Sequence, residues 1–183
     1  MKQVIATAKK IVASREYESR IERYQSPLRM RAVPFLTIMA ASMLTALPFF
    51  TEGPLLPPMG LMMLLAWRLM RPGLLPVWAG LPLGLFDDLF SGQPFGSAGL
   101  LWSLAMVAIE LIDMRAAWRD HGRDWAIASL LLVAALCAGV GIQALVERAP
   151  SLWMIMPQII ASILLYPLVV RACAIFDRWR LAT

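Results

Sequence analysis

Six apolar segments follow one another along the chain, and they constrain its fold more than any other feature. Each is close to the ~20 residues that a helix needs to cross a ~30 Å hydrocarbon core. None alternates apolar and polar residues as the strands of a membrane barrel do. Hydrophobic residues make up 60% of the chain, against roughly 45–50% in soluble proteins. The sequence therefore predicts an all-α integral membrane protein, a compact bundle of six transmembrane helices with spans at about 32–50, 55–70, 73–90, 97–112, 125–146 and 151–170.

The charged residues divide the chain into three parts: a basic segment at 1–31, the six-helix transmembrane domain at 32–176 and a short cytoplasmic tail at 177–183. In the first part, apolar residues recur at helical spacing opposite basic ones. This pattern predicts a cytoplasmic amphipathic helix on the membrane surface, where it would meet anionic lipid. A solvated helix, supported by Glu16 and Arg20 at i,i+4 spacing, is the alternative.

The basic residues also predict the orientation of the spans. Cytoplasmic loops of membrane proteins collect Lys and Arg, and with six spans and a cytoplasmic N-terminus only Arg148 of the 17 Lys and Arg residues falls outside. Leaving out the second span, which is short and the weakest of the six, would put Arg115, Arg119 and Arg123 on the wrong side. We therefore expect a bacterial cytoplasmic (inner) membrane protein with both termini in the cytoplasm, and topology accounts for the positive charge without a nucleic-acid partner.

The most distinctive stretch is GLPLGLFDDLFSGQPFG, residues 80–96, which sets two adjacent carboxylates among regularly spaced glycines. At 100° per residue, Gly80, Gly84 and Asp88 share one face of a helix with Asp87 beside them, while Phe86 points away. Glycines at four-residue spacing let another backbone approach closely in lipid. We therefore expect partner or helix packing through Gly80, Gly84, Asp87, Asp88, Gly92 and Gly96.

The two aspartates fall in the last turn of this helix, next to the negative end of its dipole, which is unfavourable. The following residues, Ser91 to Pro94, predict a turn, and Ser97 is a suitable N-cap for the next helix. Three things could compensate the carboxylates: the N-terminal end of that next helix, a basic partner, or water alone at the outer membrane boundary.

Other polar residues in the apolar segments indicate contacts between helices. Glu110 and Asp113 share a face and are expected to pair with Arg68 or Arg71, and the amides of two glutamines could hydrogen-bond between helices or line a small-molecule cavity. Tryptophan rings favour the membrane interface, which suits four of them, whereas two lie deeper and are expected to pack between helices. The glutamines are Gln143 and Gln158, the four interfacial tryptophans are Trp67, Trp125, Trp153 and Trp179, and the two deeper ones are Trp78 and Trp102.

No catalytic or cofactor motif is apparent, so we expect neither an enzyme nor a bound cofactor or metal. Nucleotide loops and zinc helices are absent, and the one histidine, His121, falls in a predicted cytoplasmic turn. A membrane serine protease would need an embedded base, which the Gly96-Ser97-Ala98-Gly99 segment lacks. The cysteines, Cys137 and Cys173, have no ligand spacing and are expected to pack as small apolar residues.

The pattern Gly-Leu-x-x-Asp-Leu-x-x-Gly-x-x-x-Gly, present from Gly84 to Gly96 in a six-span chain of this size, resembles the rod shape-determining protein MreD family. Asp88 takes the family's aspartate position, and Asp87 is an additional acid. The hydropathy resemblance extends over about residues 32–176, with Pro54, Trp67 and Pro72 in keeping with a proline-led second span.

This resemblance implies a non-enzymatic scaffold of the bacterial cell-elongation machinery, which directs peptidoglycan synthesis and rod shape. It implies MreC as the direct partner and, indirectly, MreB, RodA and a class B penicillin-binding protein. An alternative of another class is a small-molecule-binding membrane subunit of an uptake transporter, which would use a cavity near Gln143, Gln158, Trp78 and Trp102.

Overall fold

The computed structural model describes residues 27–44, 56–115, 120–146 and 152–181, and the predicted N-terminal amphipathic helix lies outside these ranges. The described residues form only helices and turns, which confirms the all-helical prediction. The helices are α2 (Pro27–Leu44), α3 (Met59–Met70), α4 (Gly80–Ser91), α5 (Ser97–Arg115), α6 (His121–Val146) and α7 (Leu152–Leu181), with a single 3₁₀ turn, η1 (Val77–Ala79), before α4.

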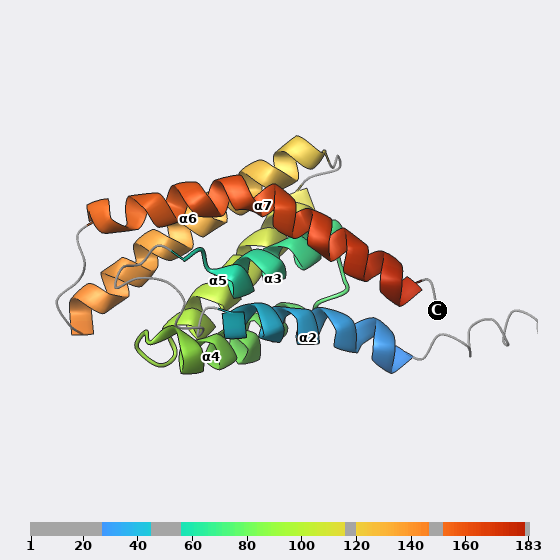
Figure 1. Ribbon diagram of the computed structural model, residues 1–183, viewed down its shortest axis with the longest axis horizontal. Helices are drawn as coiled ribbons and strands as arrows, with labels where there is room; N and C mark the ends of the chain where they lie inside the picture. The colour runs from blue at the N-terminus through green and yellow to red at the C-terminus, as the bar shows by residue number, and fades with distance from the viewer. Residues whose placement is uncertain (1–26, 45–55, 116–119, 147–151, 182–183) are drawn as a thin grey trace, which may run out of the picture.

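Successive helices run in opposite directions along the long axis of the molecule (Figure 1). The start of α2 and the end of α7 therefore lie at one end of the bundle, and the turn between α4 and α5 lies at the other. We call the first the arginine end, after Arg68, Arg71 and Arg180, and the second the turn end. The alternation is the arrangement that the charge pattern predicts for six segments with both termini on one side.

Three of the described helices are long and apolar enough to cross a membrane: α5, α6 and α7. The helix α7 is one continuous element through Leu181, well past the predicted end of the sixth span at 170. Apolar side chains such as Leu130, Leu145 and Leu164 are exposed on α6 and α7, as expected of surfaces that face lipid.

The predicted second and third spans are shorter helices of 12 residues each, α3 and α4. At 1.5 Å per residue each is about 18 Å long, less than the ~30 Å of a hydrocarbon core. Every residue of α3 from Gly60 to Leu69 is buried, because α2, α4, α5, α6 and α7 all contact it. A helix enclosed on all sides needs no complete lipid-facing surface, so α3 forms the core of the bundle.

Candidate functional site

Asp88 is buried in the last turn of α4 and caps the first turn of α5. Its carboxylate accepts hydrogen bonds from the backbone N–H groups of Gly96 and Ala98, both at 2.9 Å, and of Gly99 at 3.3 Å. The Ser97 hydroxyl donates a further one at 3.2 Å. The first N–H groups of a helix have no partner within the helix and carry its positive dipole end. The sequence left three possible partners for the two carboxylates: the next helix N-terminus, a basic partner, or water. For Asp88 the partner is the N-terminal end of the next helix, α5.

The glycine spacing has two different causes on the two sides of Asp88. Gly92 and Gly96 adopt positive φ angles of 66° and 94°, which L-residues rarely adopt. A Cβ added at either position would meet no atom within 4 Å. These two glycines therefore serve the conformation of the turn and not the approach of another helix.

Gly80 and Gly84, in contrast, serve close packing between α4 and α5. A Cβ on Gly80 would lie 2.8 Å from the Trp102 carbonyl oxygen, and one on Gly84 would lie 2.5 Å from the Ala98 carbonyl oxygen. These are contacts with backbone, which cannot rotate away. The glycine face is thus covered by α5 of the same chain, and an external helix would have to displace α5 to use it.

Asp87 points toward a different neighbour, the first turn of α3. A Cβ on Gly60, the second residue of α3, would lie 3.0 Å from Asp87 Oδ1, and Ser42 of α2 hydrogen-bonds the Asp87 carboxylate. The two adjacent carboxylates at the negative end of α4 therefore each lie at the positive end of a neighbouring helix, α3 for Asp87 and α5 for Asp88. The sequence order gives no sign of the α3 contact, because 27 positions separate Gly60 from Asp87.

A cavity of about 280 Å³ lies beside Asp87 at the turn end. Its polar lining includes Gln143 and Gln158, so the structure brings together the two intramembrane amides that the sequence singled out. Gln158 Nε2 donates to the Leu56 carbonyl oxygen at 2.7 Å, and the buried Trp102 also lines the cavity. Trp78 was expected inside, but 68% of it is exposed, because it precedes α4 in the η1 turn on the outside of the bundle.

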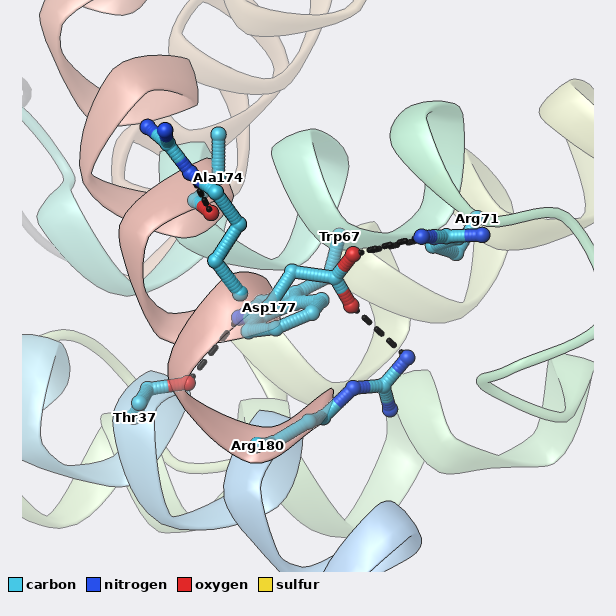
Figure 2. Close-up of polar contacts among 7 residues, drawn as sticks. Thr37, Trp67, Arg71, Ala174, Asp177 and Arg180 are labelled. Carbon is cyan, nitrogen blue, oxygen red and sulfur yellow. Dashed lines mark hydrogen bonds and ion pairs between the residues drawn. The ribbon is translucent and has the colours of Figure 1, made fainter. Parts of the chain in front are cut away.

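The arginine end holds a network of ion pairs between α3, α5 and α7. Arg68 is buried and pairs with Glu110, and its Nη1 lies 3.7 Å from Asp113 Oδ2. Arg71, which was considered for the same acids, instead pairs with Asp177 through Nη2 at 2.8 Å and Nε at 3.1 Å. Arg180 Nη2 contacts the other oxygen of Asp177 at 2.7 Å, so a single carboxylate lies between two guanidinium groups (Figure 2).

Trp67 lies inside this network, where the sequence predicted a ring at the membrane interface. It is completely buried, its Nε1 donates to Thr37 Oγ1 at 2.9 Å, and the Arg180 guanidinium carbon lies 5.5 Å from its ring centroid. Figure 2 shows the hydrogen bond from the ring nitrogen to Thr37 of α2, with Asp177 and Arg180 of α7 nearby. The sequence correctly places Trp67 near the end of a helix. It does not show that α2 and α7 cover the ring and keep it from the membrane interface. Trp125, Trp153 and Trp179 are exposed.

The Asp177→Asn substitution tests the network at the arginine end. The change keeps the size of the side chain but leaves Arg71 and Arg180 facing each other without the shared negative charge. We expect a loss of about 2 kcal/mol in the free energy of unfolding, measured by thermal unfolding in detergent. Asp120→Asn, at an exposed position before α6, is the control, and an equal effect of both variants would show that the network adds no stability.

The described residues hold no group of three or more His, Cys, Asp or Glu side chains able to bind a metal ion. Cys173 is buried and donates to Met63 Sδ at 3.0 Å, whereas Cys137 is exposed on α6. His121 is exposed at the start of α6.

An all-helical bundle in which three of the described helices are long and apolar enough to cross a membrane, around a buried core helix, is typical of a polytopic membrane protein. The family model of the rod shape-determining protein MreD matches residues 25–175, and the chain therefore belongs to the MreD family. That family is one of shape-determining membrane proteins. Neither the curated proteins nor the solved structures contain a match to this chain.

Proposed function

We propose that the chain is a non-enzymatic scaffold of the cell-elongation machinery in the bacterial cytoplasmic membrane, with MreC as its direct partner. The observation that carries this proposal is the MreD family match over residues 25–175. MreB, RodA and a class B penicillin-binding protein would be linked through MreC and the assembled complex. Long exposed apolar faces on α6 and α7 support the proposal, since a membrane segment of a partner can bind such a surface.

In this proposal all six helices lie within the membrane and the arginine end faces the cytoplasm. The helices α3 and α4 are too short to cross the membrane alone, so each would cross it together with the turn residues next to it. The positive charges of the loops at the arginine end would then obey the positive-inside rule and contact anionic lipid. The turn end, with Asp87 and Asp88, would face the periplasm.

The partner is tested by affinity purification of the tagged protein from its native membrane in mild detergent, followed by mass spectrometry. We expect MreC and cell-wall synthesis proteins to be recovered. We also expect Asp88→Leu to weaken capture of MreC more than Asp87→Leu does, because only Asp88 holds the α4–α5 turn through four hydrogen bonds. Full capture by both variants would exclude the turn from the interface, and absence of MreC from the wild-type sample would refute the scaffold proposal.

The cavity at the turn end favours one second candidate, a small-molecule-binding subunit of an uptake transporter. Pockets lined by apolar groups and a few converging polar ones are the usual form of small-molecule sites, and five helices contribute to this one. Recovery of a transmembrane coupling protein with ATPases in the same purification would establish this function in place of the scaffold.

A further inference from the structure

The cavity beside Asp87 lies between the helices of the bundle and is partly open to its surface. Side chains of α3, α4, α5, α6 and α7 all line it, with Leu61, Asp87, Trp102, Gln143 and Gln158 as one representative of each. A site that needs five helices for its wall is a property of the whole fold. Its volume of about 280 Å³ suits a small group.

The polar lining of the cavity includes several hydrogen-bond acceptors, beside the N–H donors of its amides. The Asp87 carboxylate can only accept when ionised, and its Oδ1 lies against Gly60 in the first turn of α3. The amide nitrogen of Gln158 is engaged by the Leu56 carbonyl oxygen, which leaves its amide oxygen. The Ser91 hydroxyl is buried with no hydrogen-bond partner among the described residues.

No Lys, Arg or His residue lies among the described residues that line this cavity. Its one formal charge is therefore the negative charge of Asp87. An anionic ligand would lie beside a carboxylate with no cation among the lining residues to offset the repulsion, and it would also lose its hydration on entering the cavity. A ligand that brings a positive charge and several N–H donors satisfies both the charge and the free acceptors.

We propose that this cavity binds a cationic hydrogen-bond donor, a primary ammonium or a guanidinium group, with Asp87 as its counter-ion. The amide oxygens of Gln143 and Gln158 accept from it, and the Trp102 ring provides an aromatic wall that favours a cation. The group belongs either to a free organic amine or to a Lys or Arg side chain of a partner protein inserted at the turn end. The chemistry is the same in both cases.

The test measures thermal unfolding of the purified full chain in detergent with four matched probes: butylammonium, butylguanidinium, butanol and butyrate. We expect the two cations to raise the Tm by about 3–5 °C at ten times their Kd, and butanol and butyrate to leave it unchanged. Asp87→Asn should weaken cation binding about tenfold or more, because it removes the charge but keeps the shape.

Two further variants make the result specific. Gln143→Leu leaves Asp87 intact, replaces an amide by an apolar group of similar size and should reduce the Tm rise produced by the cations. Asp120→Asn removes one negative charge at the opposite end of the bundle and should leave that rise unchanged. The proposal is overturned if neither cation raises the Tm, if butyrate does so equally, or if Asp120→Asn abolishes the effect as completely as Asp87→Asn.

The source of the cation is identified in cells with a photo-crosslinking amino acid at Leu136, which lines the cavity from α6. A crosslinked peptide that carries a Lys or Arg at the contact supports a partner side chain. A low-mass amine released from the purified protein, present in wild type and absent from Asp87→Asn, supports a free ligand. These readouts do not depend on MreC. The scaffold proposal can therefore be refuted while the cation site is supported, and the cation site can be refuted while the scaffold proposal is supported.

Discussion

The Asp88→Ala substitution is expected to lower the free energy of unfolding by about 3–5 kcal/mol. The Asp88 carboxylate accepts from three backbone N–H groups and one hydroxyl. Its removal leaves several of these donors buried without an acceptor, at about 1–3 kcal/mol each when water does not replace it. It also removes a negative charge from the positive end of α5. Thermal unfolding in detergent, followed by tryptophan fluorescence, measures the change.

The neighbouring carboxylate provides the matched control for this prediction. Asp87 is only half-buried and is held by Ser42 and the first turn of α3, so Asp87→Ala should cost about 1 kcal/mol. Asp88→Asn keeps one acceptor oxygen and should fall between wild type and Asp88→Ala. Equal losses for Asp87→Ala and Asp88→Ala would contradict the capping role of Asp88.

The turn that holds Asp88 illustrates what a sequence can predict. A glycine after the last helical turn, a proline, and a serine at the next N-cap are local signals, and they correctly predict the end of α4 near Ser91 and the start of α5 at Ser97. The need to compensate two carboxylates at a helix C-terminus also follows from the sequence. Which group stabilises each carboxylate depends on how the chain folds back. In the structure Asp88 lies at the N-terminal end of α5 and Asp87 at that of α3.

The errors concern residues whose neighbours come from distant segments. Hydropathy does not distinguish a helix surrounded by lipid from one surrounded by protein, so the apolar residues of α3 do not indicate that other helices enclose it. The same limit applies to Trp67 and Trp78, which were expected at the interface and in the interior, respectively. The Arg71–Asp177 pair joins residues 106 positions apart, and no local pattern indicates it.

The Gly84→Ala substitution is expected to lower the free energy of unfolding by about 2–3 kcal/mol through overpacking between α4 and α5. The added Cβ would lie 2.5 Å from the Ala98 carbonyl oxygen and 2.7 Å from the Gly99 Cα. Both are backbone atoms, so the contact can be relieved only by moving the helices apart. Such a movement would also lengthen the hydrogen bonds between Asp88 and the start of α5.

Gly141→Ala separates this steric effect from the general effect of replacing a helical glycine. Gly141 lies in α6, and a Cβ there would meet no atom within 4 Å. Alanine favours a helix over glycine by about 0.5–1 kcal/mol, so Gly141→Ala should raise the Tm slightly while Gly84→Ala lowers it. Opposite signs for the same chemical change would show that Gly84 is required for the close approach of α5. A stabilising effect at both positions would show that α4 can move away without cost, in which case the acidic turn would depend on the cap at Asp88 alone.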